Sequence, residues 1–485
     1  MRRLLTHLRL SGLMLMVFSL TYLLPIVSAL SFDDGTLKVF LTSMAITLGA
    51  GVSCWLVSRE HRQDLKARDG FILVFGAWVG MAAFSTLPLL GLIEGLSFTD
   101  AYFEAMSGLS TTGATVLINL DYLPPSVNLW RHELNWVGGM GIIVLVVAIL
   151  PVLGVGGRQL YVAEIPGPMK DSRLTPRITE TAKNLWLTYG VITLACLFAL
   201  KVAGMDWFDA LCHAFATMSL GGFSSHDSNI GFYDSARIEG VLIVFMLIAG
   251  MNFATHFTAW RVKELSPYRA DLEAYPFLIL IALSTLALSL LLWKDSVYPG
   301  FWLSLRHTAF NLVSIATDCG FSSQNYTEWP VFAPVWMLLL SCLASCTGST
   351  GGGIKMMRTL ILWKQTALQL FLLTHPTAVN PLKLGRQVIS DRIILSVLGF
   401  IFAYFASVVA LTLMLVLTGI DPFTAVSAVL ACLNNAGPAL GDFGPDSTYR
   451  DMTDFQTWLM TGAMFLGRIE IFTAAVLFTP AFWRK

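Results

Sequence analysis

The sequence predicts an all-α integral membrane protein in which four similar repeats surround one central axis with pseudo-four-fold symmetry. Composition is the first observation behind this prediction: 55% of the 485 residues are hydrophobic, 13% are charged, and the mean hydropathy is +0.68. Soluble domains contain about 25% charged residues, so a bilayer is the expected solvent. The second observation is a glycine-centred phrase that recurs four times along the chain. A two-helix extension is expected before the first repeat.

Ten apolar stretches are long enough to cross a membrane as helices, which takes about 20 residues each. They cover residues 10–29, 37–57, 71–92, 134–153, 185–202, 240–260, 276–293, 331–346, 393–418 and 455–482. The first stretch also imitates a secretory signal, because Arg2 and Arg3 precede it and Ala29 ends a cleavage-like triplet. Since its apolar part is long for a signal, we expect it to remain in the protein as a span.

The distribution of basic residues predicts the orientation of these spans. Lys and Arg gather in alternate loops, and no basic residue occurs between Asp69 and Arg131. Basic loops accumulate on the cytoplasmic side of bacterial membranes. We therefore expect a multi-pass protein of the bacterial cytoplasmic (inner) membrane with both termini in the cytoplasm. The net charge is zero, which argues against nucleic acid as a partner.

Shorter apolar segments lie between the spans on the predicted outer side. They cover residues 100–109, 208–218, 305–316 and 422–433. Each is about half the length of a crossing, so we expect re-entrant half-helices. Irregular backbone at membrane depth is tolerated only where it lines a water-filled cavity or is buried in protein. The repeat unit is therefore span, half-helix, glycine phrase and span. It divides the chain into an extension (1–69) and four repeats (70–155, 156–262, 263–362 and 363–485).

The glycine at the centre of each phrase is a candidate for shaping an ion site. A half-helix directs its C-terminal carbonyls, which carry partial negative charge, toward the membrane centre. A glycine just beyond lets successive carbonyls turn toward an axis and replace the hydration shell of a cation, and K⁺ is the expected guest. The alternative is that these glycines only let helices pack closely. The predicted K⁺-binding residues are Thr111, Thr112, Gly113, Leu220, Gly221, Gly222, Asp318, Cys319, Gly320, Asn435, Ala436 and Gly437.

The eighth predicted span runs into a glycine-rich stretch. Four of the six residues from 348 to 353 are glycine, which disfavours a regular helix, so the helix is expected to break there. A phosphate-binding P-loop does not fit, because Ile354 stands where that motif needs Lys. A cytoplasmic linker remains an alternative. The other hypothesis is an intramembrane loop that closes the pore from the cytoplasmic side, formed by Gly348, Ser349, Thr350, Gly351, Gly352, Gly353 and Lys355.

Charged residues near the predicted pore each allow two interpretations. Arg468 lies inside the last span, where an ionisable group is costly and faces a cavity or a partner. We hypothesise that its charge forms a barrier to cations, and the alternative is a structural pair with Glu470 or another carboxylate. Glu104, Asp209 and Asp318 either concentrate cations at the outer mouth or stabilise the fold.

Two other functional classes fit the sequence less well. A membrane-embedded enzyme would need clustered carboxylates or histidines at one interface, and the sequence indicates none, so no enzymatic activity is expected. A sodium-coupled carrier of organic solutes typically has inverted repeats, whereas these repeats all begin and end on the cytoplasmic side. A secondary carrier that couples K⁺ or another solute to H⁺ or Na⁺ in symport stays open as the alternative.

The four glycine phrases resemble those of a known family. They read Ser-Thr-Thr-Gly-Ala-Thr from residue 110, Ser-Leu-Gly-Gly-Phe-Ser from 219, Thr-Asp-Cys-Gly-Phe-Ser from 317 and Asn-Asn-Ala-Gly-Pro from 434. With the two-helix extension, they are similar to those of the Trk/Ktr/HKT superfamily of potassium transporters, and within it to bacterial TrkH-type subunits. The resemblance covers essentially the whole chain. In that family the four glycines lie in a selectivity filter, and serine at the first is associated with Na⁺ permeation.

The resemblance also implies the cargo and the partners. Gly113 at the first position implies selectivity for K⁺ and Rb⁺ over Na⁺, with K⁺ as the transported ion and no covalently bound cofactor. TrkH-type subunits form homodimers and bind a cytoplasmic regulatory ring of the RCK type, and nucleotide is expected only on that separate subunit. The basic segments 156–183 and 362–392 offer a docking surface for the ring, and lipid headgroups would explain the same charges.

Overall fold

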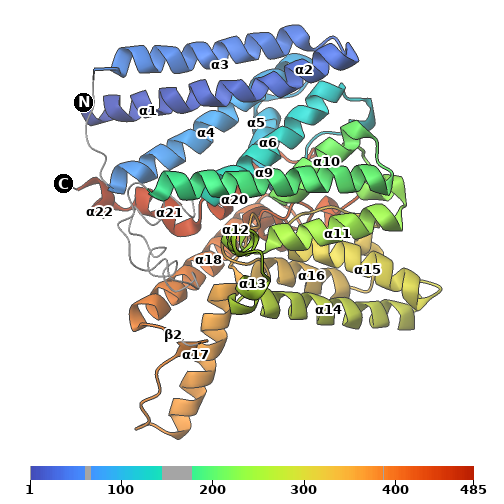
Figure 1. Cartoon of the computed structure of the whole chain (residues 1–485), viewed down its shortest axis with the longest axis vertical. Coiled ribbons are helices and arrows are strands. Elements are labelled where there is room, and N and C mark those ends of the chain that lie inside the picture. The colour runs from blue at the N-terminus through green and yellow to red at the C-terminus, as the bar shows by residue number, and fades with distance from the viewer. Residues whose placement is uncertain (1, 61–66, 145–176, 386, 485) are drawn as a thin grey trace.

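The described part of the chain is almost entirely helical. The computed structural model describes residues 2–60, 67–144, 177–385 and 387–484. Within these ranges the non-helical secondary structure is one antiparallel pair of two-residue strands, β1 (Lys383–Leu384) and β2 (Gln387–Val388). Most helices lie roughly parallel in one bundle, from which one helix projects (Figure 1). The predicted all-α class is confirmed.

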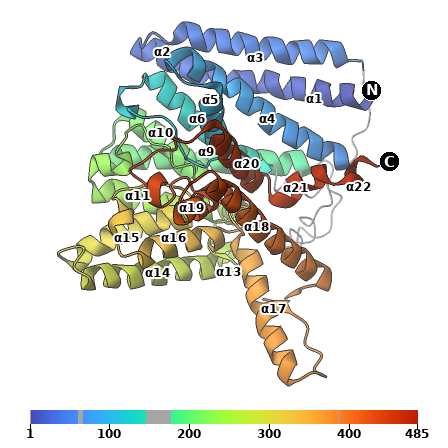
Figure 2. The same cartoon turned by 180° about the vertical axis from the view of Figure 1, so that it is seen from behind.

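The N-terminal extension packs on the outside of this bundle. It comprises α1 (Arg2–Phe18), a 3₁₀ turn, α2 (Leu23–Phe32) and α3 (Leu37–Ser58). Helices α1 and α3 lie side by side at one edge (Figures 1 and 2). Tyr22 stacks on Trp130 with ring centroids 4.6 Å apart, and its hydroxyl donates to the Phe84 carbonyl at 2.8 Å. The first apolar stretch is therefore a packed part of the fold, as expected for a retained span.

Each repeat contains one helix that matches a predicted half-helix, flanked by the helices of the predicted spans. The first repeat has α4 (Ala67–Leu92), α5 (Phe98–Leu109) and α6 (Pro125–Val144), and the second has α9 (Arg177–Ala203), α10 (Trp207–Ser219), α11 (Ala236–Gly250) and α12 (Phe253–Val262). After α13 (Ser266–Ala270), the third has α14 (Ala274–Lys294), α15 (Phe301–Ala316) and α16 (Phe332–Leu343), and α17 (Met356–Thr374) crosses the predicted boundary at residue 362. The fourth has α18 (Asp391–Leu417), α19 (Pro422–Leu433), α20 (Asp454–Arg468), α21 (Ile471–Ala475) and α22 (Pro480–Trp483). The short helices α5, α10, α15 and α19 match the four predicted half-helices.

Side-chain caps begin three of these short helices. Ser97 accepts a hydrogen bond from the Asp100 backbone at the start of α5, and Asp206 accepts one from the Asp209 backbone at the start of α10. Asp421 accepts from two backbone N–H groups of α19. Such caps satisfy helix N–H groups that lack intrahelical partners. They set where the short helices begin, and thus where their C-terminal carbonyls come to lie.

Several predicted spans are not single straight helices. Six described helices are long and apolar enough to cross a membrane, or eight if each of two bent pairs counts as one span. The sixth predicted span bends by 97° between α11 and α12, where Asn252 caps α12, and the tenth bends by 110° after α20. The eighth is reduced to the 12 residues of α16. The fourth predicted span continues beyond Val144 into residues outside the described ranges. Residues 156–176 of the predicted basic docking segment also lie outside these ranges.

Two long helices carry glycine where they meet the ends of short helices. A β-carbon on Gly138 of α6 would lie within 3.0 Å of the Leu109 carbonyl oxygen at the end of α5. In the fourth repeat, a β-carbon on Gly467 of α20 would likewise lie within 3.0 Å of the Leu433 carbonyl oxygen at the end of α19. Side chains do not approach backbone so closely, so these glycines permit the long helices to reach the C-terminal ends of the short ones.

We predict that Gly138→Ala destabilises the protein by roughly 1–3 kcal/mol, the usual cost of overpacking a filled interior. Gly190→Ala is the matched control, because Gly190 lies inside α9 and a β-carbon there meets open space. That control should be neutral or more stable by up to about 1 kcal/mol, since alanine favours helix. Thermal unfolding in detergent measures both variants. Equal midpoints for the two would contradict the close approach of α6 to α5.

Candidate functional site

The four short helices end in the same backbone turn. After each helix, one residue adopts the left-handed conformation, and the N–H of the next residue donates to the carbonyl five positions earlier, at 2.8–2.9 Å. This is the Schellman motif of helix C-termini. Left-handed backbone is uncommon for residues other than glycine, so its recurrence shows one backbone design used four times. The left-handed residues are Thr111, Leu220, Asp318 and Asn435, with φ between 54° and 64°.

Two positions after each left-handed residue stands a glycine, and the four glycines form a closed ring. Each has φ between 63° and 87° and faces the carbonyl oxygen just before the glycine of another repeat. A β-carbon on any of them would lie within 3.0 Å of that oxygen. The cycle runs from Gly113 to the Gly221 oxygen, from Gly222 to that of Cys319, from Gly320 to that of Ala436, and from Gly437 to that of Thr112. We call this arrangement the glycine ring, and we call the three residues from each left-handed residue to its glycine a ring segment (111–113, 220–222, 318–320 and 435–437).

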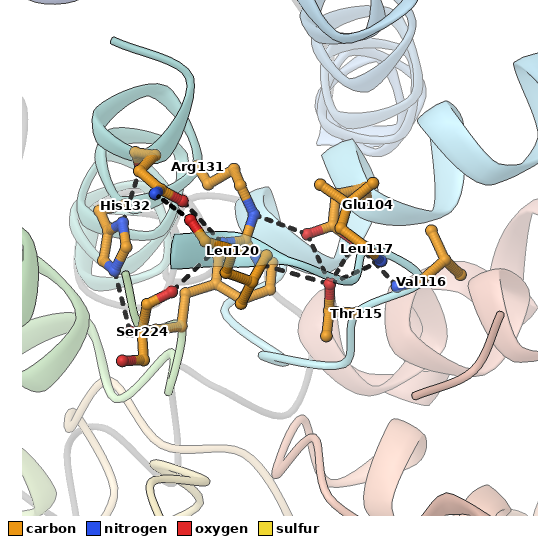
Figure 3. A network of polar contacts seen from close by, with 10 residues as sticks. Glu104, Thr115, Val116, Leu117, Leu120, Arg131, His132 and Ser224 are labelled. Carbon is orange, nitrogen blue, oxygen red and sulfur yellow. Dashed lines mark hydrogen bonds and ion pairs between the residues drawn. The ribbon is translucent and has the colours of Figure 1, made fainter. Parts of the chain in front are cut away.

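A buried ion pair lies behind the first two segments of the ring (Figure 3). The Arg131 Nε donates to Glu104 Oε1 at 2.8 Å, and both side chains are 1% exposed. Arg131 also donates to the Ser224 carbonyl at 3.3 Å, and its guanidinium lies 4.3 Å from the centre of the Phe223 ring. A planar guanidinium can make several such contacts at once. Arg131 of the first repeat therefore braces the chain that follows the second glycine.

Glu104 holds the first segment in the same network. Its carboxylate accepts the Thr115 hydroxyl at 2.9 Å and the Val116 backbone N–H at 3.1 Å. The neighbouring His132 ring lies 3.0 Å from the Phe223 carbonyl oxygen. Of the two interpretations of Glu104, the structure favours the structural one, because the carboxylate is fully enclosed by its partners. Arg131 was not among the functional residues predicted from the sequence, although a charged residue in an apolar segment is itself a signal of an interior partner.

Asp209 also serves the structure around the ring. Its carboxylate accepts the Ser225 hydroxyl at 2.7 Å and the Tyr233 hydroxyl at 2.6 Å, and it contacts the His226 ring at 3.1 Å. The other nitrogen of His226 contacts Asp121. Burial lowers the pKa of His226, but the two carboxylates outweigh burial and raise the pKa above its usual value. His226 thus links the first repeat to the second beyond the ring.

A buried loop connects α16 to α17. Helix α16 ends at Leu343 and α17 begins at Met356, which confirms the predicted helix break. We call residues 344–355 the 344–355 loop. The Thr350 hydroxyl donates to the Met218 carbonyl in the last turn of α10 at 3.1 Å, and Gly352 packs against the Asn434 carbonyl after α19. Most of its side chains are buried, so the cytoplasmic-linker alternative is wrong.

Little space remains beside this loop. The cavity between the loop and α20 has a volume of about 40 Å³, enough for a few water molecules at roughly 10–15 Å³ each. Gly351, Gly352 and Arg468 contribute to its lining. Lys355 does not extend into solvent, because its amine donates to the Gly351 carbonyl. The loop therefore occupies most of the space next to the C-terminal ends of the short helices.

Arg468 binds backbone carbonyls rather than a carboxylate. Its Nη1 donates to the Thr350 carbonyl of the loop at 2.8 Å, and its Nη2 donates to the Gly138 carbonyl of α6 at 3.1 Å. Glu470 instead pairs with Arg358 of α17 at 3.0 Å. The alternative pair of Arg468 with Glu470 is therefore wrong. The arginine joins α20 to the loop and to the first repeat, and only 3% of it is exposed.

Asp318 points toward the same loop. Its Oδ2 accepts the Ser345 hydroxyl at 2.8 Å and the Gly352 backbone N–H at 3.1 Å, and the residue is fully buried. It does not lie free at an outer mouth, so the cation-concentrating interpretation fails for this residue. No cluster of three metal-binding side chains occurs among the described residues. The ring itself offers backbone carbonyls, which are ligands for monovalent cations.

Comparisons with known proteins agree with this architecture. A family model described as "TrkH: Cation transport protein" matches residues 36–485. The chain is 46% identical over 479 residues to a Trk system potassium uptake protein TrkH of Halomonas elongata, covering 99% of both chains. It is 43% identical over 478 residues to the Escherichia coli protein of the same name, covering 98% of this chain and 99% of that one.

A solved structure shows the same fold. The crystal structure of the potassium transporter TrkH from Vibrio parahaemolyticus matches with a TM-score of 0.92 and 41% identity, covering 99% of this chain and 100% of that one. The matched family is one of transporters, so the chain is a transporter rather than an enzyme, as expected. The chain belongs to the TrkH family of cation transport proteins.

Proposed function

We propose that the chain takes up K⁺, and accepts Rb⁺ in its place, across the bacterial inner membrane. The glycine ring carries this proposal, because four repeats bring equivalent backbone carbonyls to one closed cycle. Rings of backbone carbonyls replace the hydration shell of K⁺. The relatives named as potassium uptake proteins, at 43–46% identity over nearly the whole chain, support K⁺ as the cargo.

The ring segments act as the selectivity filter in this proposal. In each repeat the left-handed residue, the residue after it and the glycine supply the ion-binding backbone. Their shared turn and the contact of each glycine with another repeat fix the spacing of the carbonyls. A filter so constrained distinguishes ions by how well its carbonyls replace water around each one.

The 344–355 loop and Arg468 form the gate. The loop occupies the space at the ends of the short helices, and the arginine places a positive charge beside it. Both features oppose a permeating cation, one by filling the path and the other by repulsion. The structure corresponds to a closed state in this proposal. Opening requires the loop to leave its contacts with Met218 and Asn434.

We infer that a separate nucleotide-binding ring of the RCK type controls this gate and that the chain works as a homodimer in contact with membrane lipid. The relatives carry the name of a Trk system, which supports a regulatory partner. Helix α17 follows the loop directly and projects from the bundle (Figures 1 and 2). We place α17 and both termini in the cytoplasm, and the domain boundaries stay as predicted from the sequence.

We predict that Gly113→Ser lowers the Rb⁺/Na⁺ flux ratio by about tenfold, which corresponds to 1.4 kcal/mol in relative ion stabilisation. The reason is steric, because the new β-carbon would overlap with the Gly221 carbonyl oxygen. Uptake of Rb⁺ and Na⁺ into proteoliposomes measures the ratio. Gly95→Ser is the control, since Gly95 has φ of +76° but open space around it. An unchanged ratio in Gly113→Ser would contradict the filter assignment.

We predict that Arg468→Gln raises Rb⁺ flux in the absence of a regulatory partner by about tenfold or more, because each hydrogen bond from a charged donor contributes roughly 1.5–3 kcal/mol. The substitution removes the charge and loosens the loop. Arg306→Gln is the control, since Arg306 pairs with Glu239 and Asp234 away from the loop. Flux in Arg468→Gln equal to that of the control would assign Arg468 a purely structural role.

A further inference from the structure

Asp318 differs from its equivalents in the other repeats. The four left-handed residues of the ring segments share one backbone conformation, but only Asp318 carries a charge; the others are Thr111, Leu220 and Asn435. The third repeat is also the one whose second span breaks into the 344–355 loop. The single carboxylate of the ring segments therefore occurs in the repeat that carries the loop.

The contacts of this carboxylate reach across the loop. Its Oδ2 accepts the Ser345 hydroxyl near the beginning of the loop at 2.8 Å and the Gly352 N–H near its end at 3.1 Å. The two donors stand seven positions apart in the chain, yet one oxygen binds both. A hydrogen bond to a charged group is stronger than one between neutral groups. Asp318 thus holds both arms of the loop against the segment that contains Gly320.

The electrostatic surroundings of Asp318 favour the same position of the loop. Burial disfavours the charged form of Asp318, and the positive charges of Lys355, at the end of the loop, and of Arg468 in α20 act against that effect. Its second oxygen, Oδ1, has no hydrogen-bond partner among the described residues. A buried carboxylate without partners is costly, so the two loop donors and the two cations provide its main stabilisation. If the loop withdraws, the carboxylate loses both donors.

We propose that Asp318 is a positioning residue that latches the 344–355 loop to the third ring segment and keeps the pore closed. The inference rests on the proposed function, in which this loop is the gate. Opening breaks the two hydrogen bonds of Oδ2 and moves Lys355 away from the carboxylate. Helix α17 begins at Met356, directly after the loop. A partner bound to α17 therefore acts on the latch through one continuous stretch of backbone.

The latch is tested from its loop side, where substitution leaves the ring segments intact. Ser345→Ala removes one of the two hydrogen bonds of Asp318, and we expect Rb⁺ flux without a regulatory partner to rise by about tenfold. The Rb⁺/Na⁺ ratio should stay at the wild-type value, because no ring residue has changed. Ser289→Ala is the matched control, since Ser289 is a buried serine of α14 whose hydroxyl donates within its own helix.

A double-mutant cycle tests the filter side. Asp318→Asn keeps the shape of the side chain but removes the charge, and asparagine tolerates left-handed backbone. This substitution should also raise the Rb⁺ flux. The flux of the double variant Asp318→Asn/Ser345→Ala should fall clearly below the product of the two single effects, since both substitutions disrupt one contact. Independent effects that multiply would overturn the latch.

Two further outcomes separate the latch from the proposed function. If Arg468→Gln conducts Rb⁺ while Ser345→Ala stays at the level of Ser289→Ala, uptake through the pore stands and the latch is refuted. If no variant conducts Rb⁺, including Arg468→Gln with a regulatory subunit supplied, the proposed function fails and the latch fails with it. Retention of each variant in detergent as a folded species, checked by thermal unfolding, excludes a simple loss of protein as the cause.

Discussion

The contact of each ring glycine with a carbonyl of another repeat is the constraint on which the rest of the structure depends. A single added carbon at any of the four positions would overlap with an oxygen across the ring. The same glycines have positive φ, as do the residues two positions earlier, so the backbone there is both crowded and conformationally restricted. Such a backbone persists only where its surroundings determine it. The capped short helices behind it, held by Schellman turns, provide that support.

The backbone follows four-fold symmetry, but the charges do not. Glu104 and Arg131 brace the first and second segments through a buried pair that can hold one geometry rigidly. Asp318 and Arg468 instead contact the 344–355 loop. In the proposed function this asymmetry separates a fixed filter from a movable gate, because the four repeats share one backbone turn while the third repeat alone supplies the loop.

The sequence predicted the features that repeat and the glycine-rich helix break, but it missed contacts that depend on single residues far apart along the chain. The half-helices and the ring glycines recur four times, so each copy supported the others. The ion pair of Glu104 with Arg131 has no counterpart to compare, and its partners come from positions 27 residues apart along the chain. The bend at Asn252 was missed because the apolar run continues through it. The choice between Glu470 and backbone carbonyls as partners of Arg468 depended on tertiary packing that no local pattern contains.

The glycines of the 344–355 loop permit close packing as well as breaking the helix. A β-carbon on Gly352 would overlap with the Asn434 carbonyl oxygen, and one on Gly351 would lie 2.9 Å from the Thr317 carbonyl oxygen. Both carbonyls belong to the ends of short helices, where partial negative charge gathers. A loop with side chains at these positions would be held away from those carbonyls and leave space for water. The absence of side chains therefore lets the loop pack directly against these carbonyls, and in the proposed function this close contact closes the path of the cation.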